Sequence, residues 1–75
     1  MTHTKQPTRH ITATVQDLWP ETGLAYATDE SKRTWGLTRS TEGVGLEHLR
    51  TGQRLELTVV EHQKFDLVTR YKPLN

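Results

Sequence analysis

Short segments in which apolar and polar side chains alternate constrain the fold of this chain more than any other feature. Side chains of a β-strand point alternately to its two faces, so each such segment is typical of a strand with one buried face. Polar turns separate the segments at intervals of roughly ten residues, as in small sandwiches and barrels. The pattern therefore predicts an all-β fold. The five predicted strands are residues 10–16, 24–28, 34–39, 54–60 and 65–71.

The length and composition allow one small domain with a lean core. The chain has 75 residues, 32% of them apolar, and a mean hydropathy of -0.75. It contains no cysteine, which excludes disulfides and thiolate metal sites. No apolar run approaches the ~18 residues of a membrane span, and no signal peptide is recognisable. We expect a cytoplasmic protein with a disordered arm over residues 1–9, a folded domain over 10–75 and no membrane contact.

The connections between the strands carry turn signals. Residues 17–23 contain Pro20, which cannot donate to a sheet, and Gly23, which permits unusual backbone angles, so a turn is predicted there. Residues 41–52 form the irregular stretch of the chain. The spacing of Leu46 and Leu49 within it predicts a single helical or 3₁₀ turn.

The hairpin predicted over residues 22–37 carries the aromatic residues of most interest. Leu24 and Tyr26 share one face of its first strand, and Trp35 and Leu37 share one face of its second. If the strands pair, we expect these four side chains to form one apolar face. Such a face is a core surface, a ligand platform, or a surface covered by a second copy or a partner.

Three stretches of the sequence match the motifs of a known family in order and spacing. Residues 13–27 align without a gap with G-T-V-K-W-F-N-x-x-K-G-F-G-F-I, and residues 34–37 align with V-F-V-H. Residues 43–57 match G-x-G-F-x-x-L-x-x-G-Q-x-V-E-F in both glycines, the leucine, the Gly-Gln pair and the glutamate. The chain thus resembles the cold-shock domain over residues 10–74. The resemblance implies a five-stranded antiparallel OB-fold barrel.

The resemblance also implies where nucleic acid would bind. In that family, aromatic side chains on the second and third strands stack on bases of single-stranded RNA or DNA. The matching positions here are Leu24, Tyr26, Trp35 and Leu37, and Trp19 is a displaced third aromatic. The same register sends the small residues of the hairpin to the interior. Those residues are Ala25, Ala27, Thr34 and Gly36.

Several of the family's binding groups are replaced, which implies weak binding. Gln16 and Asp17 stand at the positions of a lysine and a tryptophan, Thr22 replaces a lysine, and Leu46 replaces a phenylalanine. Each stacked base contributes roughly 1–3 kcal/mol. Three or four lost platforms therefore remove about 3–10 kcal/mol, whereas a micromolar complex holds only about 8 kcal/mol.

Basic residues near the hairpin are candidates for contacts with phosphates, although they also serve as ordinary solvated turn residues. Lys32 and Arg33 lie in the predicted turn, and Arg39 lies at the end of the second strand of the hairpin. The net charge of +1 is too small to favour or exclude nucleic acid by itself.

No pattern in the sequence points to catalysis or to a metal. Ser31 and Ser40 lie in polar turns without a nearby His and Asp pattern, and no glycine-rich phosphate loop is present. The histidines lack metal-ligand spacing, so no metal and no cofactor is expected. The sequence therefore predicts a binding protein and not an enzyme. The histidines are His3, His10, His48 and His62.

Two hypotheses of function follow. In the first, the domain binds single-stranded RNA or DNA weakly, with Tyr26 and Trp35 stacking on bases. In the second, the Leu24/Tyr26/Trp35/Leu37 face contacts a protein partner or a second copy of the chain.

Overall fold

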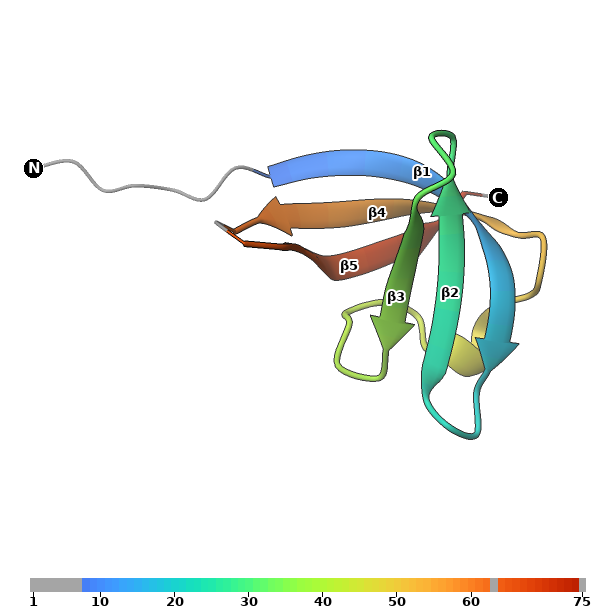
Figure 1. Cartoon of the computed structure of the whole chain (residues 1–75). Helices are drawn as coiled ribbons and strands as arrows, with labels where there is room; N and C mark the ends of the chain where they lie inside the picture. The colour runs from blue at the N-terminus through green and yellow to red at the C-terminus, as the bar shows by residue number, and fades with distance from the viewer. Residues whose placement is uncertain (1–7, 63, 75) are drawn as a thin grey trace, which may run out of the picture.

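The computed structural model describes residues 8–62 and 64–74, and these residues form five strands and one 3₁₀ turn (Figure 1). All pairings between neighbouring strands are antiparallel, so the predicted all-β, five-stranded antiparallel sheet is confirmed. No helix within these residues is long and apolar enough to cross a membrane. The elements are β1 (Thr8–Trp19), β2 (Leu24–Asp29), β3 (Thr34–Thr38), η1 (Leu46–His48), β4 (Arg54–Glu61) and β5 (Asp66–Pro73).

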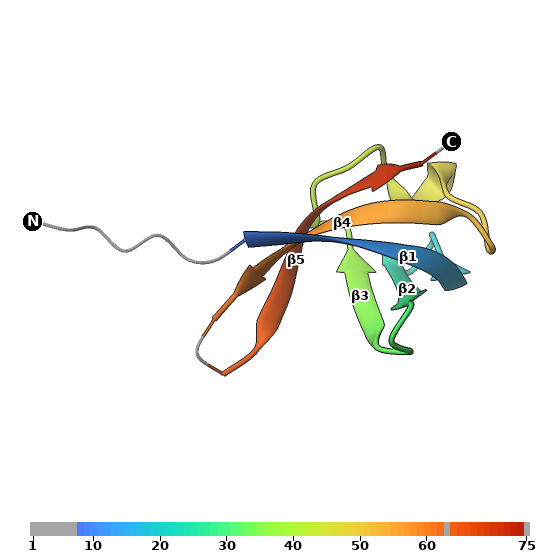
Figure 2. The same ribbon diagram turned by 90° about the horizontal axis from the view of Figure 1, so that it is seen from above.

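The sheet has the strand order β3-β2-β1-β4-β5, with the long β1 at its centre. Residues 13–19 of β1 pair with β2, and residues 8–14 pair with β4. The sheet curls into a half-barrel, so β2 and β3 lie below β1 and β4 in Figure 2, and β5 crosses obliquely beside them. The two edges, β3 and β5, approach each other near the parallel bridge between Glu42 and Arg70.

Strand β1 extends beyond its predicted limits at both ends. Thr8 and Arg9, predicted to be part of the arm, belong to β1, whereas residues 1–7 of the arm lie outside the described residues. At the other end the strand continues to Trp19. The predicted turn therefore begins at Pro20, and the N–H of Gly23 donates to the carbonyl oxygen of Trp19 at 2.9 Å.

The core lies on the concave side of the curled sheet. The alternation predicted for the first and fourth strands is confirmed there, because the inward residues of β1 and β4 are buried, with Ile11 partly so. The predicted helical turn is also confirmed as η1, and both Leu46 within it and Leu49 directly after it are buried. The core residues are Ala13, Val15, Ala25, Ala27, Trp35, Leu37, Leu46, Leu49, Leu55, Leu57, Val59, Val68 and Tyr71.

Candidate nucleic-acid interface

The register of the β2–β3 hairpin divides the predicted four-residue face between the two sides of the sheet. Ala27 pairs with Trp35, and Tyr26 pairs with Gly36. Trp35 and Leu37 are only 4% and 0% exposed, so both are core residues. The prediction of a single apolar face is therefore wrong. Trp35 and Leu37 lie inside, and Leu24 and Tyr26 lie outside and half-buried.

The turn between β2 and β3 is the physical reason for this register. The N–H of Lys32 donates to the carbonyl oxygen of Asp29, and the N–H of Asp29 donates to the carbonyl oxygen of Arg33, both at 3.0 Å. Lys32 has a φ of 70°, in the left-handed region. This is the three-residue hairpin loop in which a type I turn is followed by a left-handed residue and a bulge. Shifting a strand register by one residue turns every side chain to the other face.

The carboxylate of Asp29 connects this turn to the core. Its Oδ2 accepts a hydrogen bond from Nε1 of Trp35 at 2.9 Å. Its Oδ1 accepts from the N–H groups of Ser31 and Arg33 at 2.8 and 3.0 Å. These hydrogen bonds, that from Trp35 foremost, hold the pKa of Asp29 below its ordinary value, although burial acts in the opposite direction. Aspartate at the first position of a type I turn is a sequence signal for this arrangement.

An irregularity in β1 brings Trp19 to the outer face. Val15 pairs with Ala27, but the register shifts between Val15 and Asp17, so that Asp17 pairs with Tyr26. A β-bulge of this kind inserts one extra residue and reverses the alternation beyond it. Trp19 would otherwise point inward, as Val15 does. It is instead 45% exposed.

The outer face of β1, β2 and β3 therefore carries an aromatic pair. The rings of Trp19 and Tyr26 meet edge to face, with centroids 5.8 Å apart and an interplanar angle of 83°. Gly36 lies beside them on β3, and a Cβ there would be 3.7 Å from Cε1 of Tyr26. Gly36 therefore has no side chain that could cover the ring of Tyr26. We call Trp19, Leu24, Tyr26 and Gly36 the outer aromatic face.

One cation lies at the β1–β2 turn, and one anion lies on the outer aromatic face. Nη2 of Arg39 donates to the carbonyl oxygens of Glu21 and Pro20 at 2.9 and 3.4 Å, which holds the side chain against the β1–β2 turn. Gly23 makes room for it, because a Cβ at this position would be 2.8 Å from Nε of Arg39. Asp17, opposite Tyr26, adds a negative charge on the same face.

The remaining predicted basic residues are not gathered with Arg39. Lys32 is exposed in the β2–β3 turn, at the other end of β2. The guanidinium carbon of Arg33 lies 4.1 Å from the centroid of the Trp35 ring, and Nη1 is 2.9 Å from Oδ2 of Asp66. Because Trp35 is a core residue, Arg33 lies over the concave side of the sheet. The basic residues predicted as candidates for phosphate contacts therefore lie at separate places in the structure.

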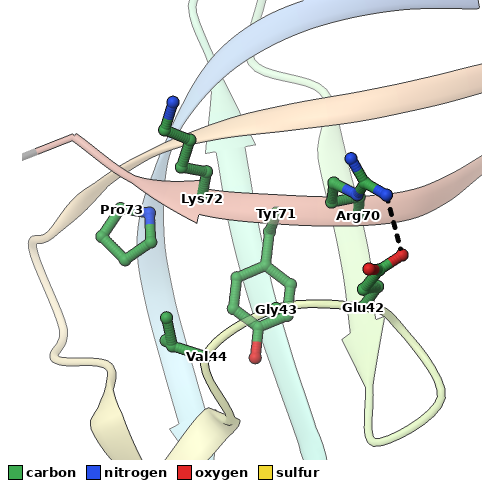
Figure 3. Close-up of a pocket in the computed structure, with 7 residues that line it drawn as sticks. All are labelled: Glu42, Gly43, Val44, Arg70, Tyr71, Lys72 and Pro73. Carbon is green, nitrogen blue, oxygen red and sulfur yellow. Dashed lines mark hydrogen bonds and ion pairs between the residues drawn. The ribbon is translucent and has the colours of Figure 1, made fainter.

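A second concave region lies between β5 and the segment that precedes η1 (Figure 3). Its volume is about 390 Å³, and its lining includes Val44 and Tyr71. The hydroxyl of Tyr71 accepts a hydrogen bond from the N–H of Gly45 at 2.8 Å, and Arg70 forms an ion pair with Glu42 at 3.0 Å. These polar groups already have partners within the chain, so the region offers few groups to a ligand. No cluster of metal-ligating side chains occurs in residues 8–62 and 64–74.

No protein-family model, curated protein or solved structure matches this chain. The resemblance to the cold-shock domain therefore depends on the motifs of the sequence alone.

Proposed function

We propose that this chain is an OB-type barrel of the cold-shock kind that binds single-stranded RNA or DNA weakly on its outer aromatic face. The strand order β3-β2-β1-β4-β5 supports the barrel. So does the parallel bridge that joins Glu42, in the segment after β3, to Arg70 of β5. An OB-fold is a five-stranded, partly open barrel that binds oligonucleotides over the face of its second and third strands and adjoining loops. The outer aromatic face lies on β1, β2 and β3, within that region.

The observation that carries the proposal is the aromatic pair on the outer face, in which Trp19 is exposed and Tyr26 is half-buried. Aromatic rings on a sheet surface serve as stacking platforms for bases without requiring a particular sequence. Tyr26 occupies a stacking position that the resemblance implies, and Trp19 adds a second ring through the bulge in β1. Trp35 has no such role in this proposal, because it is buried.

Electrostatics supports weak binding. Arg39 at one end of β2 and Lys32 at the other are the cations proposed to contact phosphates. Asp17 lies opposite Tyr26 and repels a phosphate near the platform. Few phosphate contacts imply low affinity, because neutralisation of phosphates supplies most of the sequence-independent binding energy.

Substitution of Tyr26 tests the proposal. We expect Tyr26→Ala to lower the affinity for a short single-stranded oligonucleotide at low salt by about 5- to 150-fold, the equivalent of one stacked base at ~1–3 kcal/mol. Trp19→Ala should have an effect of the same kind. Fluorescence anisotropy of a labelled oligonucleotide measures both. Phe65→Ala is the matched control, because Phe65 is an exposed aromatic residue at the β4–β5 turn, outside the outer aromatic face.

Equal affinities for Tyr26→Ala, Phe65→Ala and the original chain would contradict the proposal. Light scattering on the same samples tests the protein-partner hypothesis in its self-association form. A dimer that Tyr26→Ala dissociates, together with no binding of oligonucleotide, would favour that hypothesis instead. The surface involved would then be the outer aromatic face, since Trp35 and Leu37 are buried.

A further inference from the structure

Two arginines converge on a single carboxylate oxygen at the concave side of the sheet. Oδ2 of Asp66, the first residue of β5, is 2.9 Å from Nη1 of Arg33 and 3.3 Å from Nη2 of Arg9. Arg33 comes from the β2–β3 turn and Arg9 from β1, so three separate parts of the chain meet here. Asp66 is the least exposed of the three side chains, at 19%, whereas the arginines are about half exposed.

Each arginine also has a second partner that does not involve Asp66. The guanidinium of Arg33 stacks over Trp35, whose indole is in turn held by Asp29. Nε of Arg9 is 2.6 Å from Oε2 of Glu61. Each guanidinium group therefore has one partner that remains when the Asp66 carboxylate is removed.

We propose that Arg9 and Arg33 form a phosphate-binding site that the carboxylate of Asp66 occupies in the unliganded protein. Guanidinium groups bind the oxygens of phosphate and of carboxylate through the same charge-assisted hydrogen bonds. Asp66 therefore competes with the phosphate groups of a single strand, and it lowers the affinity of the chain for them. This inference rests on the proposed function and adds an autoinhibitory contact to it.

The charges of the cluster agree with this competition. Arg9 and Arg33 are balanced by Asp66 and Glu61, so the cluster has no net charge while Asp66 is in place. Ion pairs between side chains this exposed are weak and are screened by salt, so a phosphate can displace the carboxylate. If the ion pairs were purely structural, the outcome would differ. Loss of Asp66 would then loosen the contacts of β5 with β1 and with the β2–β3 turn, and it would create no affinity for anions.

Titration with inorganic phosphate separates these two accounts. The readout is the NMR signal of the side-chain Nε–H groups of Arg9 and Arg33. In Asp66→Asn we expect both signals to shift at phosphate concentrations at least about tenfold below those needed by the original chain, which follows from removal of the competitor. Glu47→Gln is the matched control, because it removes the same charge from an exposed residue whose carboxylate lies beside His48 and not beside the two arginines. Equal responses of Asp66→Asn and Glu47→Gln would overturn the inference.

The salt dependence of oligonucleotide binding provides a second test of the arginine site, beside the phosphate titration. Each phosphate contact with a single strand adds about 0.7 to the slope of log affinity against log salt concentration. Two released arginines should therefore steepen the slope for Asp66→Asn by about 1.4. Adding Arg33→Gln in the Asp66→Asn background should remove about half of that increase. In the original chain Arg33→Gln should change the slope little, because Asp66 already occupies the arginine.

The two arms distinguish failure of this inference from failure of the proposed function. Phosphate binding by Asp66→Asn, with no oligonucleotide binding by any variant, would support the arginine site and contradict nucleic-acid binding. Oligonucleotide binding that depends on Tyr26, with no gain for Asp66→Asn in either arm, would overturn the arginine site alone. Asp66→Ser provides the same removal if the asparagine variant shows a disturbed backbone spectrum.

Discussion

The side chain of Asp29 holds both the β2–β3 turn and a core residue, Trp35, through hydrogen bonds. Its carboxylate accepts hydrogen bonds from the turn and from the indole of Trp35. It is 8% exposed, so these partners replace most of its contacts with water. Removal of a partner of a buried donor costs about 1–3 kcal/mol, and more when the lost group is charged. Asp29 therefore stabilises both the β2–β3 turn and the buried position of Trp35.

The lowered pKa of Asp29 leads to a prediction about acid stability. Because its folded-state pKa lies below the unfolded value of about 3.9, the ionised carboxylate stabilises the fold above that value. The contribution is lost as the pH falls from there through the folded-state pKa. We expect Asp29→Asn to be less stable than the original chain at pH 7 and the difference to shrink below about pH 4. Thermal unfolding of both proteins from pH 7 to pH 2 measures it, and a constant difference would contradict this role.

At the scale of elements, small irregularities decide which side chains reach the surface. The bulge in β1 turns Trp19 outward, and the left-handed Lys32 sets the register that turns Trp35 inward. Each irregularity exchanges the two faces of the residues beyond it. The outer aromatic face therefore exists because of one bulge and one turn.

These two irregularities also explain how far the sequence could predict the structure. The strands, the 3₁₀ turn and the inward residues of β1 and β4 follow from alternation and spacing, which depend on local sequence. Inward placement of Ala25 and Ala27 agrees with the family register. The outward placement of Thr34 and Gly36 does not, because the turn pairs Tyr26 with Gly36 and Thr28 with Thr34. A left-handed lysine carries little sequence signal, since glycine, asparagine and aspartate are the residues typical of that conformation.

Alanine substitutions at two glycines, Gly43 and Gly36, are expected to affect the stability of the fold differently. A Cβ at Gly43 would clash with the ring of Tyr71, so Gly43→Ala must displace either the ring or the backbone at residue 43. We expect a loss of about 1–3 kcal/mol, as for other overpacked sites. Gly36→Ala is the control, because its Cβ would make an ordinary contact with Tyr26 and a strand glycine is conformationally costly. It should be neutral or stabilising by up to ~1 kcal/mol.

Urea unfolding of the two alanine variants provides the test. Comparable stability of Gly43→Ala and the original chain would show that Tyr71 does not pack against Gly43. A large loss for Gly36→Ala would show that the Tyr26 ring lies closer to β3 than the structure places it.

For the whole molecule, the half-open sheet predicts that the protection of backbone amides against hydrogen exchange differs from strand to strand. β1 is paired on both sides, whereas β3 and β5 are the edges and approach each other near the bridge from Glu42 to Arg70. Edge strands open at a lower free energy than central strands. We expect hydrogen exchange to be slowest for the paired amides of β1 and faster for β3 and the first residues of β5. Protection of β3 equal to that of β1 would instead indicate a barrel closed between β3 and β5.

The two proposed sites lie on opposite sides of the curled sheet. The outer aromatic face lies on the convex side of β1, β2 and β3, and the pair of Arg9 and Arg33 lies on the concave side. Under the two proposals, a bound strand contacts the outer aromatic face of the original chain, and the arginine pair contributes only after Asp66 is displaced.

The central claim is that single-stranded nucleic acid binds over the outer aromatic face. A map of backbone amide chemical-shift changes, recorded at low salt with a short single-stranded oligonucleotide in excess, tests it most directly. The account predicts the largest changes at Trp19, Tyr26 and Gly36, and small changes along β5. No changes at high-micromolar protein concentration, or changes confined to β4 and β5, would contradict it.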